Sequence, residues 1–327
     1  MRLLIRITLG YFLVGALVVT VFRDSPVVLL AELVRKLPAS MNLFLEIAWW
    51  VVPVSASMVL FVPRREMLER LTRAAVAVFA CVALFLTFTM VKATLPYVQS
   101  FWADPILGRI DRALHFGHDP WELTHRFSAW IDPDWANTIY MNWWVAPAMF
   151  LPVLLFLFDG DEVRSSRFIR LYAVAWLVLG NAIALSLLSV GPVYYDRLLG
   201  GQEFAGLAVA LEQSGIASSA TGNIQVRLWD AYVSGAQQAG SGISAFPSVH
   251  IAMITVMALY LAERSRFLVP FSVGLVAVYL FLSVYLGWHY AIDGYASILL
   301  MLGAWAWLKR RDAARPRETM PIAVPAE

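Results

Sequence analysis

The chain has 327 residues, of which 60% are hydrophobic and only 15% charged, and its formal net charge is +2. Soluble globular chains carry about 25% charged residues, so this composition excludes an ordinary soluble domain and indicates that lipid surrounds much of the surface. The near-neutral charge argues neither for nor against nucleic acid, but without a basic stripe or a nucleic-acid motif we expect no such partner. The single cysteine, Cys81, excludes an intrachain disulfide.

Eight segments are long and apolar enough to cross a bilayer, which takes about 20 mainly apolar residues. Backbone polar groups must be paired within each segment in hydrocarbon, so the sequence predicts an all-α integral membrane protein. The predicted transmembrane helices are residues 5–22, 43–62, 74–95, 136–158, 169–190, 246–262, 268–286 and 289–308. Arg2 and Arg6 precede the first segment as in a signal peptide, but no small-residue cleavage pattern follows it, so we expect an uncleaved span.

The distribution of Lys and Arg predicts the orientation of these helices. Of the 25 Lys and Arg residues, 16 fall at one set of ends and short connections, and 9 fall in the opposite, longer connections. We therefore expect both termini in the cytoplasm and the long loops 96–135 and 191–242 on the outer side. The expected location is the plasma (inner) membrane, with these loops facing the periplasm or the extracellular space.

The first long loop has a helix-start signal. Asp119 is a candidate N-cap residue, Pro120 suits the first helical position, and Glu122 stands three residues after the cap, which predicts a short helix beginning at Pro120. Three histidines occur nearby, but without a cysteine they are weak evidence for metal, and an interfacial surface helix is the favoured interpretation. These histidines are His115, His118 and His125.

The second long loop, 191–242, contains an amphipathic stretch at Phe204–Glu212 and a second possible helix around Val226–Val233. Loops of this length are often lids or binding segments. A surface flap without chemistry is an equally open alternative.

The stretch from Phe246 to His250 directly precedes an apolar run. Pro247 suits the first helical position, because its missing N–H would be unpaired there in any residue. The amides of Ser248, Val249 and His250 would then lie in the first turn, where unpaired N–H groups and the positive helix end bind anions. This pattern predicts an anion site at the outer end of the helix, and the Ser248 hydroxyl adds a donor.

A second stretch, from His289 to Asp293, pairs an imidazole with a carboxylate on one helix face, because the two residues are four apart. The carboxylate can hold one ring nitrogen and leave the other free to attack. A lone histidine at a helix end is more often interfacial, but an acid one turn inside a membrane helix is costly and usually functional. Both helices begin at the outer face, so we expect His250, His289 and Asp293 to form one site.

Together these stretches resemble the second and third signatures of the type-2 phosphatidic acid phosphatase and haloperoxidase superfamily. In particular they resemble its inositol phosphorylceramide synthase and sphingomyelin synthase branch. The resemblance covers roughly residues 74–308 and implies a six-helix catalytic core. Residues 1–73 would be an N-terminal two-helix addition, and 309–327 a basic tail that we expect to be disordered.

Departures from the superfamily signatures bear on the substrate. Classical phosphatases have a Lys and an Arg-Pro pair in a first signature, where this chain has Gly191 to Arg197 without a matching Lys. They have an Arg six residues before the third-signature histidine, where Ser283 stands, and usually a Gly where Val249 stands. A phosphomonoester carries nearly two negative charges and a diester one, so the missing cations favour a phosphodiester.

The resemblance implies a mechanism in which His289 attacks phosphorus and forms a phosphohistidine, oriented by Asp293. His250 would protonate the leaving alcohol and then activate an acceptor alcohol or water. The resemblance implies neither a metal nor a cofactor. The expected phosphate-binding residues are Ser248, Val249 and Arg197, with Arg227 as an alternative to Arg197.

The expected activity is therefore that of a membrane lipid phosphotransferase or phosphodiesterase, acting on a lipid phosphoester with an alcohol as a possible acceptor. One alternative is a lipid phosphate or polyprenyl diphosphate phosphatase. Another is a non-catalytic transporter or scaffold, for which the polar residues within the predicted helices are sparse and lie on unrelated spans. Those residues are Glu46, Asn142 and Asn181.

Overall fold

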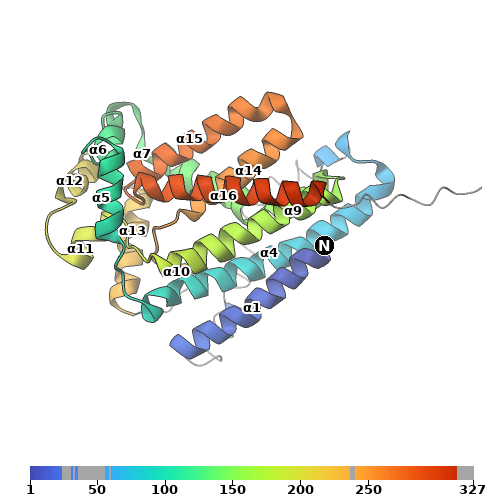
Figure 1. Cartoon of the computed structure of the whole chain (residues 1–327), viewed down its shortest axis with the longest axis horizontal. Helices are drawn as coiled ribbons and strands as arrows, with labels where there is room; N and C mark the ends of the chain where they lie inside the picture. Colours follow the sequence, from blue (N-terminus) through green and yellow to red (C-terminus); the bar gives the residue numbers. More distant parts are fainter. Residues whose placement is uncertain (24–30, 32–33, 36–55, 59, 236–239, 315–327) are drawn as a thin grey trace, which may run out of the picture.

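The computed structural model describes residues 1–23, 31, 34–35, 56–58, 60–235 and 240–314, and every regular element among them is a helix. Long helices run side by side through the molecule (Figure 1). They are α1 (Arg2–Phe22), α4 (Arg64–Val98), α8 (Trp144–Phe158), α9 (Glu162–Ala173) with its continuations η4 (Val174–Ile183) and α10 (Ala184–Ser186), α14 (Val249–Arg264), α15 (Val269–Tyr285) and α16 (Ala291–Ala313).

Shorter helices gather at one end of this bundle, which we call the short-helix end (Figure 1). It contains α5 (Asp104–Leu114), α6 (Pro120–His125), α11 (Tyr195–Leu199), α12 (Ala205–Gln213) and α13 (Ala220–Val233). The remaining short elements are η2 (Ser128–Trp130), α7 (Pro133–Asn137), η3 (Thr138–Trp143), η5 (Pro192–Tyr194) and η6 (Arg266–Leu268). The predicted helix start at Pro120 is confirmed by α6, and the two helices predicted in the second long loop correspond to α12 and α13.

Five helices of the described chain are long and apolar enough to cross a membrane, which indicates a multi-pass membrane protein. They are Arg2–Phe22, Arg64–Val98, Glu162–Ser186, Arg266–Tyr285 and Ala291–Ala313. The predicted total of eight is not confirmed. The predicted span 136–158 is bent by 54° rather than straight, and α14 has only 16 residues. The predicted span 43–62 lies largely outside the described residues.

Helix α1 packs along the bundle beside α4 (Figure 1). A Cβ atom at Gly15 would lie 2.5 Å from Thr87 Cγ2, so a larger residue there would clash with this methyl group of α4. Asn181 Nδ2 donates a hydrogen bond of 2.9 Å to Tyr11 Oη, which ties α1 to η4. Asn181 therefore has a role in helix packing.

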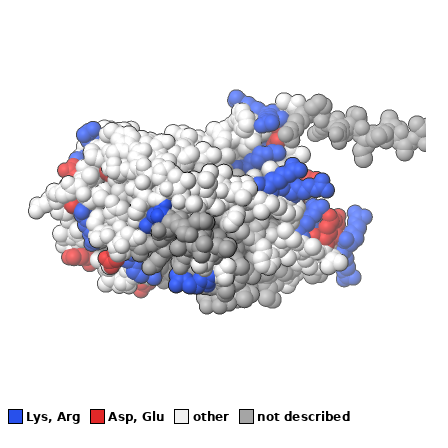
Figure 2. Space-filling view, turned by 90° about the horizontal axis from the view of Figure 1, so that it is seen from below, with Lys and Arg blue, Asp and Glu red and all other residues white. Residues whose placement is uncertain are grey.

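On the face that Figure 2 shows, much of the described surface between the two ends is white, without charged side chains. Lys and Arg side chains gather at the end opposite the short helices, where α4 and α9 begin and α16 ends (Figures 1 and 2). At that end, buried Arg167 of α9 donates to Glu263 of α14 at 2.7 and 2.8 Å and to Asp312 of α16 at 2.7 Å. This ion network holds three helices of the bundle together.

Replacing Arg167 with Met should lower the free energy of unfolding by about 3–5 kcal/mol, because two carboxylates with largely buried side chains lose their main ion-pair partner. Thermal unfolding of the purified chain in detergent measures the change. Arg264→Met is the matched control: this arginine is 45% exposed and lies 3.9 Å from Asp159, so its removal should change stability by less than about 0.5 kcal/mol. Equal effects of the two substitutions would contradict the assigned role.

Candidate active site

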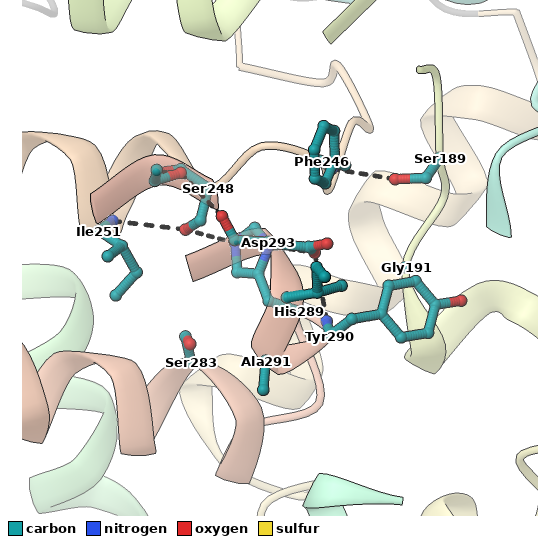
Figure 3. A network of polar contacts seen from close by, with 12 residues as sticks. Ser189, Gly191, Phe246, Ser248, Ile251, Ser283, His289, Tyr290, Ala291 and Asp293 are labelled. Atoms are coloured by element: carbon teal, nitrogen blue, oxygen red, sulfur yellow. Dashed lines mark hydrogen bonds and ion pairs between the residues drawn. The ribbon is translucent and has the colours of Figure 1, made fainter. Parts of the chain in front are cut away.

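The beginnings of α14 and α16 are joined by backbone and hydroxyl contacts. The Ser248 amide donates to the Asp293 carbonyl at 3.3 Å, and the Ser297 hydroxyl donates to the Ser248 carbonyl at 2.9 Å. Small side chains at these positions let the two helix starts meet. As a result, the two sequence stretches with candidate catalytic residues lie side by side at one level of the bundle (Figure 3).

His289 and Asp293 form the predicted pair, but His289 lies just before α16, whose N-cap is Tyr290, so the two residues do not share a helix face as predicted. His289 Nδ1 lies 3.1 Å from Asp293 Oδ2, which also accepts the Tyr290 amide at 3.2 Å (Figure 3). On the other edge of the ring, Nε2 lies 3.2 Å from the Ser248 hydroxyl. With Nδ1–H donating to the carboxylate, Nε2 presents its lone pair toward Ser248. The ring is therefore oriented for attack by Nε2.

His250 is held flat between two aromatic rings. Its ring centroid lies 4.6 Å from that of Tyr140 and 3.8 Å from that of Trp144, with interplanar angles of 6° and 15°. Trp144 Nε1 also donates to the His250 carbonyl at 3.2 Å. Tyr140 lies in η3, a π-helical segment, and such segments occur frequently at functional sites.

Both histidines line one cavity of about 190 Å³. Ile224 and Leu228 of α13 lie in its wall, so the second long loop contributes directly to the site. Three buried polar atoms of the wall have no hydrogen-bond partner among the described residues, and such groups suit a polar ligand. These atoms are Tyr140 Oη, His250 Nε2 and Trp288 Nε1.

The predicted helix start at Pro247 is wrong by two residues. Ser248 is the N-cap, its hydroxyl accepts the Ile251 amide at 3.4 Å, and the helix begins at Val249. A serine side chain can pair an amide of the first turn and proline cannot, so the cap prevails. The Ser248 amide is paired with α16, which leaves the Val249 and His250 amides as the first-turn donors.

Of the other predicted phosphate-binding residues, only Val249 lines the cavity. Exposed Arg197 lines a neighbouring pocket, and its guanidinium carbon lies 6.0 Å from the Trp229 ring centroid. Arg227 is exposed on α13. Ser283, at the place of the third-signature Arg, donates its hydroxyl to the Leu280 carbonyl and stands apart from the network in Figure 3.

The three histidines of the first long loop have separate partners. His115 contacts the Asp111 carbonyl and the Tyr295 hydroxyl, His118 pairs with Glu122, and His125 contacts Ser128 within the same turn. In the described part of the chain, no three His, Cys, Asp or Glu side chains gather in a way that could hold a metal ion.

Two buried acids of α5 support the site, and the sequence analysis missed both. Asp104 accepts the Val190 and Gly191 amides at 2.9 Å and the Tyr290 hydroxyl at 3.1 Å. Asp111 accepts the Ala291 and Ile292 amides at 3.0 and 2.9 Å, which caps the first turn of α16. Burial raises the pKa of Asp104, and burial raises the pKa of Asp111 to about 6.

Lys92 of α4 also lines the cavity with the two histidines, and the sequence analysis counted it only as a basic residue of the outer side. The available signal was its place inside the apolar stretch 74–95. An ionisable side chain within a membrane helix is a functional candidate by default.

A family model described as PAP2 superfamily matches residues 105–307, more than half of the chain. The matched range contains His250, His289 and Asp293. No curated protein and no solved structure matches the chain.

Replacing Asp111 with Asn should change how the free energy of unfolding depends on pH, because asparagine does not titrate. The folded-state pKa of about 6 exceeds the ordinary 3.8, so folding favours the protonated acid. Its contribution is then fully present below pH 3.8 and is lost as the pH rises through about 6. Across that window, wild type should lose on the order of 3 kcal/mol relative to Asp111→Asn. Thermal unfolding of both proteins at several pH values measures the difference, and a pH-independent difference would contradict it.

Proposed function

Because this chain belongs to the PAP2 superfamily, we propose that it transfers or hydrolyses the head group of a membrane lipid phosphodiester through a phosphohistidine intermediate. Superfamily membership indicates phosphatase or phosphotransferase chemistry. One observation carries the finer proposal: His289 Nε2, oriented through Asp293, lies 3.2 Å from the Ser248 hydroxyl, and His250 lines the same cavity. Nucleophile, anion-binding helix start and proton donor thus meet in one place.

In the first step, the Nε2 lone pair of His289 attacks phosphorus, and the bond between phosphorus and the leaving alcohol oxygen breaks. Protonated His250 gives its proton to that oxygen, so the alcohol leaves neutral. Asp293 holds the Nδ1 proton and stabilises the positive charge that develops on the His289 ring. The Ser248 hydroxyl and the first-turn amides of α14 donate to the phosphoryl oxygens.

In the second step, neutral His250 removes a proton from an acceptor alcohol or from water. The acceptor oxygen attacks phosphorus, and the bond between phosphorus and His289 Nε2 breaks. His289 returns to its neutral form, and His250 is protonated again for the next cycle. An alcohol acceptor makes the protein a transferase, and water makes it a hydrolase.

A phosphodiester is favoured over a phosphomonoester because the cavity has few cations. Of the Lys and Arg residues in the described chain, only Lys92 lines the cavity. A diester presents one negative charge and a monoester nearly two, so one cation and a helix N-terminus match the diester.

We place the active site on the outer side of the plasma (inner) membrane, with the basic end of the bundle in the cytoplasm. The grouping of Lys and Arg opposite the short-helix end supports this orientation (Figure 2). A lipid substrate would then reach the cavity from the outer leaflet.

His289→Ala should abolish turnover of every lipid phosphoester, because the nucleophile is lost. His250→Ala should slow turnover about 10²–10⁴-fold with an ordinary alcohol leaving group, and much less with nitrophenol, which needs little protonation. Mass analysis of products from purified protein with phosphodiesters and phosphomonoesters, with and without acceptor alcohols, measures both effects. His118→Ala, which changes a half-exposed histidine away from the cavity, is the control. Wild-type turnover by His289→Ala would refute the assigned roles.

The orientation is testable by cysteine labelling, because the single native cysteine, Cys81, is buried. Phe116 is 97% exposed near α5, and Arg311 is exposed near the end of α16. In intact cells, a membrane-impermeant maleimide should label Phe116→Cys and leave Arg311→Cys unlabelled until the cells are permeabilised. The reverse pattern would place the active site in the cytoplasm.

A further inference from the structure

Among the described residues, Lys92 is the cationic side chain of the cavity wall to which the two steps above give no part. It lies in α4, a helix apolar enough to cross a membrane, and it lines the cavity together with His250 and His289. A charged side chain within a membrane helix is costly and usually faces a partner of opposite charge or a ligand. Lys92 is therefore placed to face an anionic group in or beside the cavity.

The described residues give Lys92 no carboxylate partner. Its Nζ lies 5.9 Å from the Phe88 ring centroid, and no acid of the described chain forms an ion pair with it. Asp293, the buried acid of the site, is engaged by His289 and by the Tyr290 amide instead. An ammonium group in such surroundings is suited to an anionic ligand.

The segment before α14 keeps the lysine side chain at the cavity. Gly242 packs directly on α4, and a Cβ atom there would lie 2.6 Å from the Ala93 amide nitrogen and 2.9 Å from Lys92 Cγ. The same segment is anchored by the Ala245 amide, which donates to the Ser189 carbonyl at 2.9 Å. The stem of Lys92 therefore packs between α4 and this segment, whose residues also line the cavity.

We propose that Lys92 is the phosphate-binding cation of this site, supplied by α4 in place of the cations missing from the first and third signatures. This inference rests on the proposed function, and it also defines the substrate class. With Arg197 at a neighbouring pocket and Arg227 exposed, one ammonium group and the N-terminus of α14 compensate the ligand charge. Their combined charge of roughly +1.5 exceeds that of a diester and falls short of that of a fully ionised monoester.

Orthovanadate, which adopts the five-coordinate geometry of phosphoryl transfer, is the probe for this role. Its binding to the full-length protein in detergent can be followed by tryptophan fluorescence, since Trp288 lines the cavity. Lys92→Met should weaken vanadate binding about tenfold to a hundredfold, because a charge-assisted contact is lost. Lys92→Arg should stay close to wild type. Lys309→Met, which removes an exposed lysine at the far end of α16, is the matched control.

Thermal unfolding separates this binding role from a structural one. A lysine held for a ligand stabilises nothing in the ligand-free fold, so Lys92→Met should unfold at the same temperature as wild type or higher. A lower unfolding temperature together with unchanged vanadate affinity would make Lys92 a structural residue and overturn the proposal.

A second variant, His289→Ala, keeps this test distinct from that of the proposed function. If vanadate affinity falls in Lys92→Met but not in His289→Ala, the lysine binds the oxyanion and the phosphohistidine scheme is wrong. If vanadate affinity falls in His289→Ala but not in Lys92→Met, the assignment of His289 as the nucleophile is supported and the lysine proposal is overturned. Loss in both variants supports both assignments, and a wild-type protein that neither binds vanadate nor turns over a phosphoester overturns both.

Discussion

The meeting of two helix N-termini is the constraint on which the site depends. Ser248 offers its amide to the Asp293 carbonyl and accepts the Ser297 hydroxyl on its own carbonyl, so α14 and α16 begin at one level. Without that contact, the imidazole of His289 would have its carboxylate but no hydroxyl or helix start opposite Nε2. The catalytic pair is local to the residues around the start of α16, whereas the site needs the starts of two helices.

Outside the bundle, α5 holds the start of α16 and the Val190–Gly191 segment in place by burying two acidic side chains, and burying an acid costs free energy. Asp104 and Asp111 are almost fully buried, and each accepts backbone amides that would otherwise lack partners. Asp111 caps α16 and Asp104 holds the Val190–Gly191 segment beside the cavity, where classical members have their first signature. The short-helix end therefore fixes the backbone segments around the site and also forms part of the cavity wall.

Local patterns in the sequence were sufficient for some of these features and insufficient for others. Spacing of four residues predicted the contact between His289 and Asp293, although His289 precedes the helix on which the prediction placed it. Apolar length predicted most of the long helices. The contacts of Asp104 and Asp111 span about 80 to 190 positions and have no local signature. Lys92 was missed because it was counted with the loop cations, although an apolar helix surrounds it. The eight-span count was not confirmed because apolar length alone does not reveal a short helix or a bend.

A covalent bond between phosphorus and His289 is the central claim, and trapping that bond tests it most directly. His250→Ala protein is incubated with a nitrophenyl phosphodiester carrying radioactive phosphorus, because nitrophenol leaves without protonation while the second step still lacks its base, and the reaction is quenched in alkali, where phosphohistidine survives. Peptide mass analysis then locates the label. The account predicts an acid-labile phosphoryl group on His289 that still bears the second ester alcohol of the substrate. Label on another residue, or turnover by wild type without any labelled protein, would contradict it.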